Sequence, residues 1–283
     1  MLRIAIQAKG RLNEESIGLL AEAGVSIEDS KRKLLARSDG FPLEVLYLRD
    51  DDIPQAVSMG VADLGVVGLN EVEEKGFDVE IVHRLGFGKC RLSLAVPKTE
   101  PYDGLPYFEG KRVATSYPVI LSRFFREKGI AAEIHEIAGS VEIAPSVGMA
   151  DAIFDIVSSG GTLVTNGLKE VEQVLFSEAV LIGGRALSDD KRQILSQLLF
   201  RIEAVERSRG LKYVLMNLPH AKIPEAVRIL PGMKSPTILP LAQEGWSSMH
   251  VVINERELWS KIEQLKAIGA EDILVLSLEK MIR

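Results

Sequence analysis

A loop of small residues follows an apolar run in the stretch DIVSSGGTLVTNG, residues 155–167. Glycines in such a loop leave the backbone N–H groups accessible and allow positive φ, and hydroxyl side chains add hydrogen-bond donors. Where the loop enters a helix, its N–H groups converge and favour an anion, with phosphate the first candidate. We therefore predict a phosphate site, with a glycine turn and a threonine helix cap as the structural alternative. The predicted loop consists of Ser158, Ser159, Gly160, Gly161 and Thr162.

A carboxylate, Asp155, stands at the end of the apolar run just before this loop. Its negative charge disfavours contact with phosphate, but its oxygens can accept hydrogen bonds from sugar hydroxyls a few ångströms away. A carboxylate beside a phosphate loop therefore fits a ribose 5-phosphate.

Cationic side chains follow two other predicted strands. Lys9 and Arg11 come after the strand at residues 2–6, and Arg49 comes after the strand at residues 43–48. Ligand loops of α/β proteins follow the carboxyl ends of strands, so we predict that these cations meet a polyphosphate. Solvated loop charges are the alternative.

Other chemistries have no matching pattern in the sequence. The stretch GFGKC, residues 86–90, lacks the spacing of a nucleotide-binding P-loop, because position 83 is a histidine and Cys90 follows the lysine. The four histidines are too scattered to predict a metal site or a catalytic triad. Cys90 is the only cysteine, so no internal disulfide is expected.

Composition narrows the class of protein further. The chain has 283 residues, of which 46% are hydrophobic, enough for two or three domains with sizeable cores. Its net charge of −6 argues against a nucleic-acid partner, which calls for a basic face. No apolar run approaches the roughly 20 residues that span a bilayer, and the N-terminus lacks the apolar core of a signal peptide. We therefore expect a cytoplasmic protein with no membrane contact.

Alternating strands and helices must position these residues. The first part of the chain predicts the order βαβαβ, with strands at residues 2–6, 43–48 and 62–68 and helices at 13–24 and 50–60. This order indicates a largely parallel sheet. Asn13 is the expected cap of the first helix. A second α/β unit begins near residue 91, and a cleft between two lobes is expected. The predicted parts are lobe I (residues 1–90, completed by 178–210), lobe II with the phosphate loop (91–177) and a C-terminal domain (211–283).

The C-terminal domain has a different pattern. From Lys212 onward the strands and helices follow the order βαββαβ, which is the ferredoxin-like arrangement, in about 70 residues. This size and order predict a small separate domain.

Together these stretches resemble one known family. The segment from Glu142 to Leu163, EIAPSVGMADAIFDIVSSGGTL, is similar to the signature of ATP phosphoribosyltransferase, the first enzyme of histidine biosynthesis. The resemblance extends over essentially the whole chain, including the C-terminal part that marks the long form. Further similar motifs are QAKGRL, RDDDIP, DLGVVG, GKCRLSLAVP, GKRVATSYP and ILVLSLEKM.

The resemblance implies a fold and a reaction. The fold is a two-lobed core like the type II periplasmic binding proteins, with a ferredoxin-like regulatory domain. The reaction condenses ATP with 5-phosphoribosyl 1-pyrophosphate to give N1-(5-phosphoribosyl)-ATP and pyrophosphate, with Mg²⁺ as cofactor. L-Histidine is the implied feedback inhibitor, and a homo-oligomer that shifts between dimer and hexamer is the implied assembly.

The resemblance also implies roles for individual residues. The loop at 158–162 holds the 5-phosphate, and Asp155 and Glu142 face the ribose. Asp63 and Tyr117 line the cleft, while the metal ligands stay unassigned. In the C-terminal domain, Ser235 and Thr237 are candidate donors for histidine, with an ordinary strand entry as the alternative.

Two other functions share parts of this pattern. A solute-binding protein has a similar two-lobed core but is normally exported, and a small-ligand sensor accounts for the C-terminal domain but not for the phosphate loop. A catalytic subunit dependent on a partner protein is a third reading, since short-form relatives lack the C-terminal domain. The presence of residues 212–283 favours a self-sufficient enzyme.

Overall fold

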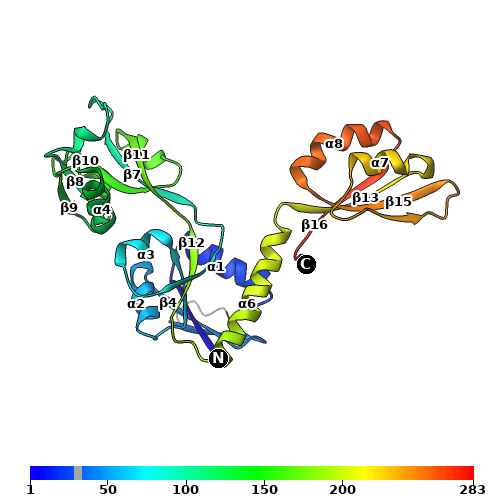
Figure 1. Cartoon of the computed structure of the whole chain (residues 1–283), viewed down its shortest axis with the longest axis horizontal. Coiled ribbons are helices and arrows are strands. Elements are labelled where there is room, and N and C mark those ends of the chain that lie inside the picture. Colours follow the sequence, from blue (N-terminus) through cyan, green and yellow to red (C-terminus); the bar gives the residue numbers. More distant parts are fainter. Residues whose placement is uncertain (29–33) are drawn as a thin grey trace. The chain divides into compact units, whose positions relative to one another are not determined.

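The computed structural model describes residues 1–28 and 34–283 (Figure 1). They divide into two compact units, residues 1–21 with 25–195 and residues 22–24 with 196–283. The first unit holds two sheets, and the second unit holds one. Five positions of the predicted first lobe, 29–33, lie outside the described residues. In the described part of the chain, no helix is both long and apolar enough to cross a membrane.

Seven strands form the first sheet, in the spatial order β2-β3-β4-β1-β5-β12-β6. Their bounds are β1 (Leu2–Gln7), β2 (Ser26–Ile27), β3 (Leu35–Asp39), β4 (Leu43–Leu48), β5 (Leu64–Gly68), β6 (Glu80–Arg84) and β12 (Ala179–Gly183). The three predicted strands β4, β1 and β5 are adjacent and parallel. The outer strands pair antiparallel, so the sheet is mixed, and the prediction of a largely parallel sheet was wrong at its edges.

Short helices flank the first sheet: α1 (Arg11–Glu22), α2 (Ile53–Ser58), α3 (Leu69–Lys75) and the 3-10 turn η1 (Asp50–Asp52). Helix α1 begins two residues before the predicted cap. The side-chain amide of Asn13 instead donates to the carbonyl oxygen of Gln7 over 2.7 Å. Asn13 therefore ties the first turn of α1 to the end of β1, and its prediction as the helix cap was wrong.

Five strands form the second sheet, in the order β11-β7-β10-β8-β9. Its elements are β7 (Cys90–Pro97), η2 (Leu105–Phe108), β8 (Arg112–Thr115), α4 (Pro118–Lys128), β9 (Glu133–Glu136), η3 (Val141–Ile143), β10 (Ala152–Val157), α5 (Gly161–Thr165) and β11 (Leu168–Ser177). Buried aromatic residues, among them Phe108, Phe125 and Phe154, fill the core between α4 and the sheet. After β11 the chain returns to the first sheet, where β12 pairs with β5 and β6.

The second unit is a βαββαβ domain preceded by most of a long helix, α6 (Asp189–Ser208). Its elements are β13 (Leu211–Pro219), η4 (His220–Lys222), α7 (Ile223–Ile229), β14 (Thr237–Pro240), β15 (Trp246–Asn254), α8 (Glu255–Ala267) and β16 (Glu271–Ser277). The antiparallel sheet has the order β14-β15-β13-β16, and α7 and α8 cover one face of it (Figure 1). This order is that of a ferredoxin-like domain, as predicted.

Candidate functional site

The predicted phosphate loop lies between the end of β10 and the start of α5. Gly160 has φ +83°, a left-handed conformation in which it precedes the first residue of α5, Gly161. The first turn of a helix leaves N–H groups without intrahelical partners. In this loop the N–H of Gly161 donates to the hydroxyl of Ser159 over 3.5 Å. This helix is only five residues long, and the chain continues into β11.

Asp155 lies on β10, three residues before the loop, and is half-buried. The pKa of Asp155 is raised from its ordinary value of 3.8 to about 6, mainly by burial. The N–H of Ile156, 2.8 Å from Oδ1 of Asp155, lowers this pKa, and the nearby charge of Glu142 raises it. Glu142 sits in the 3-10 turn η3, which follows Ser140 in a left-handed conformation at φ +52°. The structure thus brings the two predicted ribose-facing carboxylates close together.

Tyr117 precedes α4 and is 7% exposed. Its hydroxyl hydrogen-bonds with Glu71 and accepts from the side-chain amide of Asn70 over 3.2 Å. Burial is the main cause that raises the pKa values of both Tyr117 and Glu71. Ser177 fixes Asn70 in turn. The hydroxyl of Ser177 donates to Oδ1 of Asn70 over 2.7 Å and accepts from the backbone N–H of Asn70 over 3.0 Å. This buried network joins α3 to the elements of the second sheet.

A cavity of about 280 Å³ opens beside this network. It brings Arg11 and Lys89 together with Ser158 of the phosphate loop, so side chains from both lobes share one space. The remaining lining residues are Gln7, Leu12, Asp50, Gly68, Asn70, Glu71, Gly88, Cys90, Ile156 and Ala179.

The predicted polyphosphate cations lie at the carboxyl edge of the first sheet. Lys9 and Arg11 follow β1, Arg49 follows the adjacent β4, and the strands are in parallel register from Leu2 to Gln7. All three side chains are exposed. Arg11 forms an ion pair with Glu15 over 2.9 Å, and Arg49 forms one with Asp51 over 3.2 Å. Exposed pairs of this kind are weak and can yield to a phosphate.

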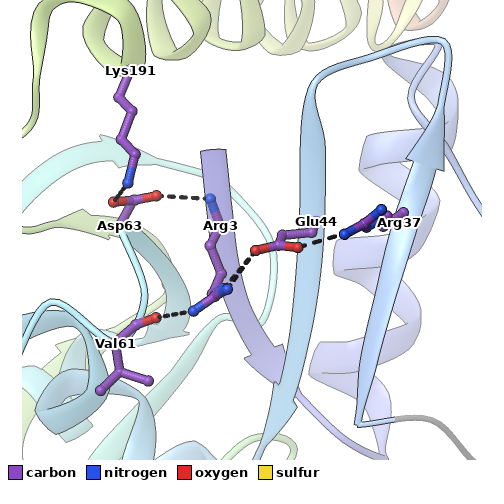
Figure 2. A network of polar contacts seen from close by, with 6 residues as sticks. All are labelled: Arg3, Arg37, Glu44, Val61, Asp63 and Lys191. Atoms are coloured by element: carbon purple, nitrogen blue, oxygen red, sulfur yellow. Dashed lines mark hydrogen bonds and ion pairs between the residues drawn. The ribbon is translucent and has the colours of Figure 1, made fainter. Parts of the chain in front are cut away.

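Asp63, in contrast, is not brought to this cavity. It precedes β5 and therefore lies at the amino edge of the parallel strands, where its Oδ2 accepts from the backbone N–H of Arg3 over 2.9 Å. Its Oδ1 accepts from Nζ of Lys191 over 2.7 Å, and Figure 2 shows both partners around the carboxylate. With its two oxygens engaged at the opposite end of the sheet, Asp63 is left out of the proposed site.

The two candidate effector residues lie in the second unit. The hydroxyl of Ser235 donates to the carbonyl oxygen of Pro236 over 3.2 Å, and Thr237 opens the edge strand β14 opposite His250. Both residues are exposed. A groove of about 930 Å³ between α7 and α8 is lined by other residues, including Arg228 and Lys261.

Four residues around this cavity and its network were not predicted from the sequence: Asn70, Glu71, Ser177 and Lys89. Asn70 and Glu71 lie in the first turn of α3, which follows β5 at the same carboxyl edge as Lys9 and Arg49. The rule that predicted those cations therefore also applies to them. Ser177 pairs with Asn70 across 107 positions of the chain, a separation for which the sequence offers no signal.

Comparison with known proteins decides the family. A family model described as ATP phosphoribosyltransferase matches residues 49–204, more than half of the chain. A second model, described as the HisG C-terminal domain, matches residues 208–280. The chain belongs to the ATP phosphoribosyltransferase family. The match to both models confirms the predicted long form of this enzyme of histidine biosynthesis.

Full-length relatives agree with this assignment. The ATP phosphoribosyltransferase of Bacteroides thetaiotaomicron is 61% identical over 282 residues, with 100% of both chains covered. That of Cytophaga hutchinsonii is 51% identical over 283 residues and covers 100% of this chain and 99% of its own.

Solved structures agree on the fold. A chain of the ATP phosphoribosyl transferase (HisG:HisZ) complex from Thermotoga maritima superposes with a TM-score of 0.63 at 29% identity, covering 72% of this chain and 96% of that one. A histidine kinase sensor domain with similarity to periplasmic binding proteins has a TM-score of 0.50 at 9% identity, covering 74% and 91% of the two chains. The predicted two-lobed α/β core of an ATP phosphoribosyltransferase with a ferredoxin-like third domain is therefore confirmed.

Proposed function

We propose that the chain condenses ATP with 5-phosphoribosyl 1-pyrophosphate at the cavity described above, giving N1-(5-phosphoribosyl)-ATP and pyrophosphate. The observation that carries the proposal is the shared lining of this cavity by Arg11, Lys89 and Ser158. It supplies cations for a polyphosphate from one side and the phosphate loop from the other. The family assignment supports ATP as the acceptor.

In this proposal the loop at 158–162 binds the 5-phosphate through backbone N–H groups and the hydroxyls of Ser158, Ser159 and Thr162. Asp155 and Glu142 accept hydrogen bonds from the ribose hydroxyls. With a pKa of about 6, Asp155 is ionised at neutral pH and can stabilise the positive charge that develops on the sugar as pyrophosphate leaves. Tyr117 and Glu71 form the wall beside them.

Adenine N1 attacks the anomeric carbon from the face opposite to pyrophosphate, so the configuration inverts. The reaction then depends on orientation and charge stabilisation, with no requirement for a catalytic histidine. Lys9, Arg11 and Arg49 neutralise phosphate charges of the two substrates.

Mg²⁺ fits the donor chemistry of this site. It prefers oxygen ligands and is commonly held by one or two carboxylates together with substrate phosphates. Asp155 and Glu142 are close enough for the charge of one to raise the pKa of the other, and they would present such oxygens. The bound ion would neutralise the pyrophosphate leaving group. The described residues include no group of three or more His, Cys, Asp or Glu side chains placed to hold a metal without substrate.

We further propose that the C-terminal domain binds L-histidine, with Ser235 and Thr237 as candidate contacts, and that histidine acts on a homo-oligomer that shifts between dimer and hexamer. The match of residues 208–280 to the HisG C-terminal domain supports a regulatory role. We also propose a cytoplasmic location, as expected for an enzyme of histidine biosynthesis.

One assay tests the catalytic proposal. The full-length protein is mixed with ATP, 5-phosphoribosyl 1-pyrophosphate and Mg²⁺, and both the ultraviolet absorbance of the adduct and the released pyrophosphate are followed. We expect the two products to form in equal amounts and only when both substrates are present. Pyrophosphate release without ATP, or no reaction with both substrates, would contradict the proposal.

A further inference from the structure

Arg91, on β7, contacts the phosphate loop without being part of it. Its Nε and Nη2 each lie 2.5 Å from an oxygen of Glu170 on β11, a two-pronged pairing of guanidinium and carboxylate. Its third contact runs from Nη1 to the carbonyl oxygen of Ser158, over 3.2 Å. Arg91 therefore connects a fixed carboxylate to the first residue of the loop.

The sheet holds this connection in place. Strand β7 lies between β10 and β11, and Arg91 stands opposite Val157, the last residue of β10 before the loop. The hydroxyl of Ser93 donates to Oε1 of Glu170 over 2.7 Å, which fixes the carboxylate from a second side. The hydrogen bonds from Arg91 hold the pKa of Glu170 below its usual range, so the carboxylate stays charged across neutral pH. Both side chains of the pair are only about one-fifth exposed, 23% and 21%.

The contact with Ser158 controls the orientation of one peptide group. In a planar trans peptide, the carbonyl of Ser158 and the N–H of Ser159 point in opposite directions. Holding the carbonyl toward Arg91 therefore directs this N–H away from the guanidinium, to the other side of the loop. If the peptide turned over, a carbonyl oxygen would replace a donor there and would repel a phosphate.

We propose that Arg91, held by Glu170, is a positioning residue that fixes the peptide between Ser158 and Ser159 in the orientation needed to bind the 5-phosphate. This inference rests on the proposed function, in which the loop at 158–162 takes that phosphate. Arg91 acts through the loop: its planar fork can hold Glu170 and the carbonyl of Ser158 at once, whereas a lysine ammonium offers no such fork.

Steady-state kinetics on full-length Arg91→Met, Arg91→Lys and Glu170→Gln test the proposal. We expect the KM for 5-phosphoribosyl 1-pyrophosphate to rise about tenfold or more in Arg91→Met, the effect of losing one charge-assisted hydrogen bond. The KM for ATP should stay within about twofold of the wild-type value. Arg91→Lys should not restore the KM for 5-phosphoribosyl 1-pyrophosphate to its wild-type value. Glu170→Gln keeps the arginine and should raise the same KM by a smaller factor than Arg91→Met does.

Arg112 is a matched control in the same sheet. It pairs with Asp151 through two nitrogens, at 2.9 and 3.3 Å, and donates Nη1 to the carbonyl oxygen of Gly148 over 3.1 Å. This cluster lies at the beginning of β10, whereas the phosphate loop follows its end. Arg112→Met should lower the melting temperature about as much as Arg91→Met, while its KM for the sugar pyrophosphate should stay within about twofold of wild type.

The possible outcomes separate the two proposals. A wild-type protein whose rate does not depend on 5-phosphoribosyl 1-pyrophosphate would overturn the proposed function. If the wild-type protein saturates with this substrate but the KM is unchanged in folded Arg91→Met or in Glu170→Gln, only the proposed role of Arg91 is overturned. Restoration of the wild-type KM by Arg91→Lys would show that charge, and not loop geometry, is the requirement.

Discussion

At the scale of single residues, Asp155 combines a proposed catalytic role with an energetic cost. Its ordinary pKa of 3.8 is raised to about 6 in the folded chain, mainly because burial disfavours the charged form. The folded state therefore binds this proton more tightly than the unfolded state does, and folding loses stability as pH rises from about 4 through 6. A destabilising charge of this kind is typical of binding sites, where function opposes stability.

Replacing Asp155 with asparagine tests this account. At pH 8 the variant should be more stable than wild type by about 1–3 kcal/mol, because one pKa unit corresponds to about 1.4 kcal/mol and partial exposure reduces the effect. The gain should shrink as pH falls toward 4, where Asp155 is protonated in the folded state, and should vanish only below its ordinary pKa of 3.8. Turnover at pH 8 should fall about tenfold or more, because a neutral amide stabilises a developing cation poorly. Urea unfolding at pH 5 and pH 8, together with kcat, measures both effects.

Equal stability of the two proteins at both pH values would show that burial does not penalise this charge. Wild-type kcat in the folded variant would show instead that the carboxylate has no part in the reaction.

At the scale of elements, α3 and α4 are joined by a carboxylate at a helix start. The two oxygens of Glu74 accept hydrogen bonds from the backbone N–H groups of Val119 and Ile120, each over 2.9 Å. Glu74 is 7% exposed, so these charged hydrogen bonds are largely shielded from water. Its neighbour Glu73 instead forms an exposed ion pair with Arg123 over 2.9 Å.

These two adjacent residues give a matched comparison. Glu74→Ala should lower the free energy of unfolding by about 1.5–3 kcal/mol, since it removes charged hydrogen bonds and leaves N–H groups buried. Glu73→Ala should cost at most about 0.5–1 kcal/mol, as expected for an exposed pair. Urea unfolding of both variants measures the difference. Equal losses would mean that Glu74 does not fasten α4 to α3.

The sequence predicted elements best where the pattern is local. The strand at residues 43–48 matches β4, and the loop enters a helix at Gly161, within the predicted stretch 158–162. Asn13 was misplaced because its partner is the carbonyl oxygen of Gln7 and not the helix backbone. The short strands β2 and β3 were missed because they pair at a sheet edge, where a buried apolar alternation is not required.

At the scale of the whole molecule, the C-terminal domain is the part whose predicted role is regulatory. We expect millimolar histidine to inhibit the full-length enzyme without competing with the sugar pyrophosphate, because it binds one global state better than another. Truncation after Gly210 should abolish this inhibition. Steady-state kinetics with and without histidine on both proteins are the measurement.

The truncated protein needs a check of its fold. Its missing residues include Glu279, whose carbonyl oxygen accepts from the hydroxyl of Ser208 over 2.9 Å, and Met281, whose N–H donates to the carbonyl oxygen of Ala204 over 2.8 Å. Retained activity without histidine shows that the catalytic core is intact. Competitive inhibition, or inhibition that survives truncation, would remove the C-terminal domain from regulation.

The predicted site depends on contacts that only the folded chain reveals. The phosphate loop and Asp155 are contiguous in sequence, so their residue types alone pointed to phosphate and sugar. The glycines near Asp63 did not show which edge of the sheet it reaches. A residue before a parallel strand lies at the amino edge and one after it at the carboxyl edge, and Asp63 precedes β5. Arg91 and Glu170 are 79 positions apart and become a pair only through the strand order β11-β7-β10.

The central claim is that the loop at 158–162 binds the 5-phosphate, and the affinity of Gly160→Val for 5-phosphoribosyl 1-pyrophosphate tests it most directly. Gly160 has φ +83° and no heavy atom within 4 Å of an added Cβ, so valine strains the loop without crowding the core. Gly129, at the end of α4, has φ +69° and the same open surroundings, so Gly129→Val is the control. By titration calorimetry, we expect Gly160→Val to bind about tenfold or more weakly than wild type and Gly129→Val to bind like wild type. Wild-type affinity in a folded Gly160→Val would contradict the claim.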